Sequence, residues 1–327
     1  MTSMFKLGLG PMSHEIVDIL TRYSIHDKPV MIIASRNQVD ADSGYVMTTA
    51  ELKTAIDRNP SKNIMLCRDH CGPYFLDSEK NLSQQAAIEA TKKTIAADIE
   101  MGFDLIHIDT SRCNDGYVVA DDLIKFCLDL NPNIQFEFGT EENVGVAAGI
   151  TKYKDDVTFA KQFPNMKFVV AQTGSLVYEN RQAGSFASNI VKDLVEFAND
   201  AGVGLKEHNA DYLSAYEIER RKLVGVHALN VAPQLGVIQT KLIKDWATTY
   251  ELTEEWNTFA NTVISSGKWA KWTDSTDSDM RVAVAGHYLF NDISYRTLVD
   301  KLGSHTNWLQ KLEYRVQDLV DLYLRNL

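Results

Sequence analysis

Polar side chains that could do acid–base or metal chemistry stand at the ends of several short apolar runs in this sequence. These residues are Asp69 and His70, His107 and Asp109, Gln135 and Glu137, and Lys206 and His208. Because side chains alternate along a strand, the spacing of two within the last three pairs puts both members on one face. Such endings, repeated along one chain, predict a shared reaction chamber.

Imidazole and carboxylate groups together are the material of a divalent-metal site. Neutral imidazole with carboxylate binds Zn²⁺ well and leaves a position open for a substrate oxygen. For His70 and His208 a ligand role and a hydrogen-bonded structural role are both open, whereas His107 lies deeper in its run and is expected to be structural. Asp69 or Asp109 could then move a proton beside a metal-polarised carbonyl.

Lys206 offers a competing chemistry. A lysine that projects into a barrel can form a Schiff base with a ketone, although an ion-paired lysine is the more common case. Glu207 has the opposite parity to His208 and is expected to face a helix layer.

The elements that must position these residues alternate regularly between short apolar strands and amphipathic helices. The expected strands cover residues 29–35, 63–69, 104–110, 134–139, 167–173, 204–208 and 226–232, with an eighth at 282–290. Near-continuous apolar strands separated by helices indicate parallel βαβ units. We therefore expect a single α/β domain over residues 1–327, a (β/α)8 TIM barrel with a C-terminal helical extension. The final helix should pack on the barrel or on a partner subunit.

A Rossmann-type sheet is disfavoured, because ASRNQVDAD after the first of these runs lacks the G-x-G-x-x-G turn. That loop instead offers Asn37, Gln38 and Tyr45, whose amide and hydroxyl groups suit sugar hydroxyls.

The bulk composition narrows the function classes. The chain has 327 residues, is 45% hydrophobic and carries a formal net charge of -11. This charge argues against binding to nucleic acid or to an anionic membrane. The sequence shows no membrane-length apolar run and no signal-peptide pattern, so we expect a cytoplasmic protein. The cysteines Cys67, Cys71, Cys113 and Cys127 are expected to be free thiols.

Several of these segments together resemble the non-catalytic (Z-type) subunit family of class II D-tagatose-1,6-bisphosphate aldolase, formerly described as tagatose-6-phosphate kinase. The segments that carry the resemblance are SRNQVDADSGYVMTT, RDHCGP, GFDLIHIDTS, FGTEENV, VVAQTG, KEHNADY and LNVAPQL, in the family's order over roughly residues 30–240. The resemblance implies a barrel related to class II aldolases, with Asp69 as general base and His70 and His208 as zinc ligands.

Two departures from the related patterns bear on activity. Catalytic class II aldolases supply a third histidine where this chain has Gln172, and the family's lysine after the seventh strand is Asn230 here. These departures leave room for a divergent branch with another sugar substrate.

The leading hypothesis is a metal-dependent carbohydrate lyase or epimerase that uses retro-aldol or enolisation chemistry. The expected catalytic residues are Asp69, Asp109 and Glu141. The expected ligands of a divalent metal, Zn²⁺ first among them, are His70, His208 and Glu137, with Glu137 or Glu141 completing or orienting the site. The expected substrate-binding residues are Asn37, Gln38, Tyr45, Gln172, Asn209, Asp211 and Asn230.

The expected partners are a carbohydrate substrate, which could be phosphorylated, and a second copy of the chain in a homo-oligomer. The alternative hypothesis is a non-catalytic subunit that stabilises a catalytic aldolase subunit in a hetero-oligomer.

Overall fold

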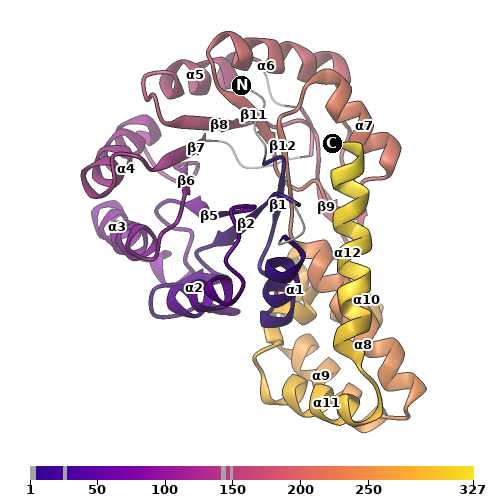
Figure 1. Cartoon of the computed structure of the whole chain (residues 1–327). Helices are drawn as coiled ribbons and strands as arrows, with labels where there is room; N and C mark the ends of the chain where they lie inside the picture. Colours follow the sequence, from indigo (N-terminus) through magenta and orange to yellow (C-terminus); the bar gives the residue numbers. More distant parts are fainter. Residues whose placement is uncertain (1–4, 25–27, 141–144, 148–149) are drawn as a thin grey trace.

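Eight parallel strands close into a barrel, and each is followed along the chain by a helix (Figure 1). The computed structural model describes residues 5–24, 28–140, 145–147 and 150–327. The barrel strands are β1 (Leu7–Leu9), β2 (Val30–Ser35), β5 (Ile64–Cys71), β6 (Leu105–Asp109), β7 (Gln135–Gly139), β8 (Met166–Val170), β11 (Gly204–Glu207) and β12 (Ala228–Val231). Neighbours in the chain are neighbours in the barrel, and β12 pairs with β1 to close it.

The helices that surround the barrel are α1 (His14–Ser24), α2 (Thr49–Arg58), α3 (Gln84–Glu100), α4 (Gly116–Leu130), α5 (Ile150–Ala160), α6 (Ser188–Asp200), α7 (Ala215–Val224) and α8 (Pro233–Thr249). Local sequence explains several of their ends. Thr48 and Glu51 form a capping box at the start of α2, and Gly225 ends α7 in the left-handed conformation. The predicted α/β barrel is confirmed.

The predicted eighth strand at residues 282–290 is wrong. This stretch forms α10 (Ser278–Ala285) and the 3-10 helix η3 (Gly286–Leu289), and its apolar run Val282–Ala285 is buried in helical form. A short apolar run fits a buried helix as well as a buried strand. The strand that completes the barrel is instead β1, which pairs with both β12 and β2.

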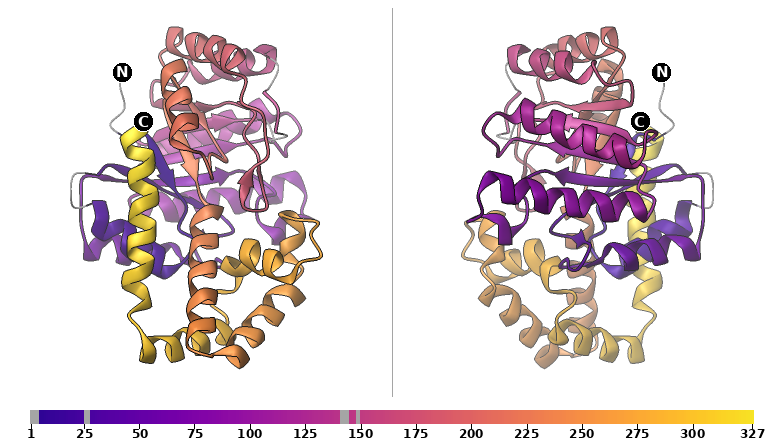
Figure 2. Two further views of the ribbon diagram at one scale, coloured as in Figure 1. Left: turned by 90° about the vertical axis from the view of Figure 1, so that its right-hand side faces the viewer. Right: turned by 90° about the vertical axis from the view of Figure 1, so that its left-hand side faces the viewer.

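The extension consists of α9 (Thr253–Ser265), the 3-10 helix η2 (Lys268–Lys271), α10, η3, α11 (Ile293–His305) and α12 (Trp308–Asn326). It lies against the barrel, and α12 runs back along the barrel's outer helices (Figure 2). This last helix contacts α1, α7 and α8, as expected for a helix that packs on its own barrel. None of the helices described is both long and apolar enough to span a membrane.

Two small two-stranded sheets lie in the loops that follow the barrel strands. They are the pair β3 (Val39–Asp40) and β4 (Met47–Thr48), and the hairpin of β9 (Val177–Tyr178) and β10 (Arg181–Gln182). A further 3-10 helix, η1 (Asp77–Glu79), follows β5. The four cysteines are free thiols, as predicted.

The barrel interior is layered along its axis. An apolar layer formed by Met31, Ile33, Met65, Cys67, Leu105, Phe168 and Ala228 fills it. One step further along the same inward-facing parity stand Asp69 after Cys67 and His107 after Leu105. Because side chains alternate along a strand, the polar residues at the strand ends point into the barrel directly above this packed apolar layer.

Candidate metal centre

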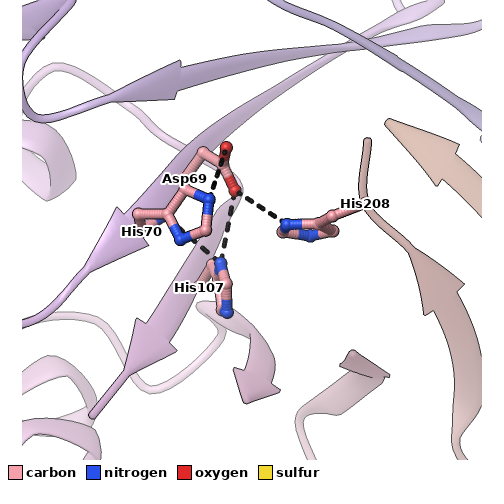
Figure 3. A group of neighbouring side chains, drawn as sticks. All are labelled: Asp69, His70, His107 and His208. Atoms are coloured by element: carbon pink, nitrogen blue, oxygen red, sulfur yellow. Dashed lines mark hydrogen bonds and ion pairs between the residues drawn. The ribbon is translucent and has the colours of Figure 1, made fainter. Parts of the chain in front are cut away.

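Three histidines and one aspartate meet at the mouth of the barrel (Figure 3). Donor atoms of Asp69, His70, His107 and His208 all lie within 4.8 Å of one another. The ring centres are 5.3 Å apart for His70–His107, 5.3 Å for His70–His208 and 5.1 Å for His107–His208. The Asp69 carboxylate points between the three rings, with Oδ1 at 3.2 Å from Nδ1 of His107 and 3.9 Å from Nδ1 of His208.

An irregularity in β5 brings Asp69 and His70 to the same site. In a regular strand, consecutive residues would point to opposite faces. Between Arg68 and Cys71 the register against β6 shifts, and His70 adopts a positive φ of 46°. Bulges of this kind re-aim side chains next to active sites, and left-handed backbone at a non-glycine residue is costly enough to need such a context.

Gly72 is required by the close approach of the neighbouring loop. A Cβ at this position would lie 1.6 Å from the carbonyl oxygen of Asp109. The turn after the Asp-His pair therefore packs directly on the end of β6, which only a residue without a Cβ allows.

Two buried carboxylates hold two of the imidazoles from behind. Nδ1 of His70 lies 2.6 Å from Oδ2 of Asp109, and Nε2 of His208 lies 2.6 Å from Oε1 of Glu137. Nζ of Lys206 donates to the other oxygen of Glu137 at 2.5 Å. Each of these rings therefore turns its second nitrogen toward the cluster. A carboxylate behind the histidine is the usual outer shell of a metal ligand.

The charges of the cluster shift its pKa values. Burial raises the pKa of Asp69, but the surrounding histidines outweigh it and hold that pKa well below the usual range. Burial would lower the pKa of His70, but the charge of Asp69 and the bond to Asp109 raise it to about 9. For Glu137, Lys206 and the histidines overcome burial and lower the pKa. In His208 burial prevails and lowers the pKa. The site therefore favours ionised carboxylates at neutral pH.

His107 belongs to the cluster, although its position in the strand pointed to a structural role. The residue is 2% exposed, and its Nε2 atom is buried without a hydrogen-bond partner in the part of the chain that the structure describes. Its Nδ1 atom faces both an acceptor, Asp69 Oδ1, and a donor, the backbone N–H of His70 at 3.2 Å. Because Nδ1 faces Asp69 and lies among the donor atoms of the cluster, His107 belongs to a set of side chains that fits a divalent metal.

The sequence allowed two roles for Lys206, a Schiff-base lysine or an ion-paired one, and in the structure Lys206 forms an ion pair. Its side chain is fully buried and its Nζ is bound to Glu137, so that it does not present a free amine to the cavity. Glu207 faces the helix layer, as predicted, and accepts a hydrogen bond from Arg221 of α7 at 2.7 Å.

A cavity of about 400 Å³ opens in front of the cluster. Of the expected substrate-binding residues, Asn37, Gln172 and Asn209 line it together with His70, His107 and His208. Gln38 and Tyr45 line an adjoining cavity of about 580 Å³, which also contains Asp69, His70 and Asn209.

The other predicted residues lie elsewhere. Asp211 is fully buried, and its Oδ1 accepts hydrogen bonds from the backbone N–H groups of Ala232 and Gln234. Asn230 is buried at the inner face of β12, and neither polar atom of its side chain has a hydrogen-bond partner among the described residues. Glu141 lies outside the described residues.

Sequence reasoning missed the residues that reach the mouth from other parts of the chain. Arg112 follows β6, whereas Lys271 and Trp272 come from the extension, and all three line the cavity of about 400 Å³. No local pattern marks Lys271 or Trp272, because only the packing of the extension places them there.

The family resemblance is confirmed. Residues 14–125 match the model of the GatZ/KbaZ-like family, described as D-tagatose-1,6-bisphosphate aldolase subunit GatZ/KbaZ-like. This match includes the Asp-His pair of β5 and the His-x-Asp pair of β6. A comparison with curated proteins found no match.

Solved structures share the fold. A probable tagatose 6 phosphate kinase from Sinorhizobium meliloti 1021 superposes with a TM-score of 0.84 at 16% identity, covering 98% of this chain and 100% of that one. Fructuronate-tagaturonate epimerase UxaE from Cohnella laeviribosi gives 0.62 at 9% identity, over 97% of this chain and 80% of that one. Fructose-bisphosphate aldolase from Campylobacter jejuni gives 0.54 at 11% identity, over 96% and 89%. At these identities the likeness concerns the fold.

Proposed function

We propose that this protein is a divalent-metal-dependent lyase or epimerase that acts on a sugar or sugar phosphate by retro-aldol or enolisation chemistry. The observation that carries the proposal is the cluster of three imidazoles and a carboxylate at the floor of an open cavity. The cluster lies at the C-terminal ends of the barrel strands, and barrel enzymes have their active sites at this end. The aldolase and epimerase that share the fold are consistent with this chemistry.

In this proposal His70, His107 and His208 hold the metal, with Zn²⁺ the first candidate because it suits imidazole donors. A divalent metal there would polarise a substrate carbonyl and stabilise the charge of an enolate. Asp109 and Glu137 position His70 and His208, respectively, through the 2.6 Å contacts behind the rings. Glu137 was expected either to bind the metal or to orient the site. In this proposal it orients His208 and does not bind the metal.

Asp69 is the proposed general base. Its carboxylate lies beside all three rings and also lines the cavity of about 580 Å³, so that it can reach both the metal and a bound substrate. In a retro-aldol or epimerisation reaction it would take the proton whose removal generates the enolate and later return one. Asn37, Gln172 and Asn209 line the cavity and offer amides for the substrate hydroxyl groups.

Metal content and turnover should separate these roles. The purified protein should contain stoichiometric divalent metal, measured by elemental analysis, and chelation should abolish turnover of ketose phosphates. His208→Ala should lose metal and turnover together, whereas Asp69→Asn should retain metal and lose turnover. Full activity of metal-free protein would contradict the proposal.

A second candidate is a non-catalytic subunit that stabilises a catalytic class II tagatose-bisphosphate aldolase. Two points favour it. The matched family model describes an aldolase subunit, and the resemblance implies that catalytic relatives have a histidine at the place of Gln172. Co-purification from the native cells would reveal such a partner. Turnover by the isolated protein would decide against a purely stabilising role. A single-domain cytoplasmic protein, active as a homo-oligomer, remains our expectation.

A further inference from the structure

His70 is the least enclosed of the three imidazoles in the metal cluster. Its side chain is 41% exposed, compared with 3% for His107 and 9% for His208. It stands at the irregular end of β5, and its backbone has a positive φ. A strained backbone of this kind persists only where the surrounding structure holds it. The orientation of His70 must therefore depend on contacts from the loops around the barrel mouth.

Phe75 covers one face of the His70 ring. The two rings are stacked, with their centres 5.4 Å apart and an angle of 15° between their planes. The guanidinium of Arg112 lies over the Phe75 ring as well, 4.3 Å from its centre. Whereas the Asp109 carboxylate contacts the edge of the His70 ring at Nδ1, Phe75 contacts its face. The two contacts together define how the imidazole is turned.

A buried ion pair closes the turn that carries Phe75 from β5 to η1. Oε2 of the buried Glu79 accepts the N–H of Tyr74 at 2.8 Å. The guanidinium of Arg36, directly after β2, meets both oxygens of Glu79, with Nη2–Oε1 at 2.6 Å and Nη1–Oε2 at 3.1 Å. Nη1 of Arg36 also donates to the carbonyl oxygen of Gly72 at 2.8 Å. The pair therefore holds the turn on both sides of Tyr74.

Helix α3 and the loop after β2 anchor this pair. The buried guanidinium of Arg36 donates to the hydroxyls of Thr91 and Thr94, both at 3.1 Å. Nδ2 of Asn37 donates directly to the carbonyl oxygen of Phe75 at 2.6 Å. A bidentate arginine–carboxylate pair has a defined geometry, and breaking a buried pair is costly. The turn, and Phe75 with it, is therefore fixed against the His70 ring.

We propose that Arg36, Glu79 and Phe75 are positioning residues, which hold the His70 imidazole in the orientation in which it binds metal. The ion pair fixes the turn, the turn fixes Phe75, and the phenyl ring restricts rotation of the His70 side chain. This inference rests on the proposed function for the ligand role of His70, whereas the order of the turn and of His70 can be tested without metal.

The affinity for Zn²⁺, measured by competition with a chromogenic chelator, tests the ion pair. Glu79→Gln removes the charge that holds Arg36 and should weaken Zn²⁺ binding about tenfold, as for groups that orient metal ligands. Asp98→Asn is the matched control, because Asp98 forms an equally buried pair with Arg68, between α3 and β5. It should bind Zn²⁺ as wild type does. Equal losses in the two variants would show general destabilisation and overturn the proposal.

Substitution of Phe75 tests the last contact and leaves the buried pair intact. Phe75→Leu should weaken Zn²⁺ binding about three- to tenfold, because the aromatic stack is lost. Phe75→Tyr keeps the aromatic face and should retain the affinity of wild type. Phe75 is partly exposed, so these variants decide the question even if Glu79→Gln does not fold. Wild-type affinity in Phe75→Leu would overturn the proposal.

Amide hydrogen exchange in the metal-free protein, measured by NMR, separates this inference from the proposed function. The N–H groups of His70 and Tyr74 should exchange faster in Glu79→Gln, relative to those of β6 and β7, and His70 should do so in Phe75→Leu. Asp98→Asn should leave this relative exchange unchanged. Absence of Zn²⁺ binding by wild-type protein would contradict the proposed function, and the exchange would still decide whether these residues hold His70. Unchanged exchange at His70 in both variants would overturn their positioning role.

Discussion

The two sides of the cavity are built in different ways. The metal cluster stands on barrel strands, and its outer carboxylates are buried, with Glu137 only 1% exposed. The opposite wall comes from the short 3-10 helix η2 and the residue after it, where Lys271 is exposed and Trp272 is held through its backbone and its indole N–H. A rigid floor suits chemistry that depends on geometry, whereas exposed side chains at the rim can vary to select substrates.

Loss of the buried cation should show how strongly the floor depends on its charges. Lys206→Met leaves the carboxylate of Glu137 buried without its ion-pair partner, and we expect the free energy of unfolding to fall by about 3–5 kcal/mol. Urea denaturation measures this loss. The double variant Lys206→Met/Glu137→Gln should recover part of the stability, because it removes the uncompensated charge. A double variant less stable than Lys206→Met would contradict this account.

Removal of the His107 imidazole should show whether metal affinity depends on the floor of the cavity. His107→Ala should weaken Zn²⁺ binding by more than about 100-fold, the upper range for outer-shell partners, because a ligand contributes more than its support. Competition with a chromogenic chelator measures the affinity. Asp109→Asn should lose about 10- to 100-fold, since it only positions His70, and Lys222→Gln, on the exposed face of α7, should lose nothing. Unchanged affinity in His107→Ala would show that His107 is structural, as its place in the strand first suggested.

Most of the barrel could be predicted from the sequence, because its strands are buried on both faces and read as apolar runs. The first strand could not. Leu7–Leu9 is three residues long and draws its stability from pairing with β12 and β2, which only the closed barrel provides. The apolar run in residues 282–290 resembled a strand more than β1 did. A short run of apolar residues is typical of a buried strand and of a buried helix alike, so hydrophobicity does not distinguish them.

Part of the candidate site could be predicted from two features of the sequence, the polar residues at the ends of apolar runs and the alternation of side chains along a strand. These features indicated the Asp69–His70, His107–Asp109 and Lys206–His208 pairs, and they predicted that Glu207 points away from the barrel interior. The bulge that turns both Asp69 and His70 inward has no mark in the sequence, and the depth of His107 in its strand concealed its neighbours. Lys271 and Trp272 reach the site through tertiary packing alone.

The extension should also stabilise the loop that carries His208, by a moderate amount. The hydroxyl of Tyr323 in α12 donates to the carbonyl oxygen of Ala210 and accepts from the N–H of Leu213. Tyr323→Phe should therefore lower the free energy of unfolding by about 1–2 kcal/mol, the cost of leaving buried backbone groups unpaired. Tyr314→Phe on the same helix is the control, because Tyr314 is 54% exposed. Equal effects of the two variants would argue against a specific role of α12 in holding this loop.

The smallest effect concerns Asp211, which joins the loop after β11 to the start of α8. Burial raises its pKa to about 7, and its Oδ2 atom has no hydrogen-bond partner within the described ranges of the chain. The folded protein therefore retains a proton that the unfolded chain releases above pH of about 4, and the stability contributed by this group falls as pH rises from about 4 to 7. Asp211→Asn keeps the acceptor for Ala232 and Gln234 and removes the titration. Its stability relative to wild type should rise by about 1 kcal/mol or more between pH 5 and 7, measured by urea denaturation at each pH. Asp193→Asn, an exposed carboxylate on α6, should show no such trend. A flat difference for Asp211→Asn would mean that the carboxylate is already ionised at pH 5, and that the N–H groups at the start of α8 stabilise its charge more than burial opposes it.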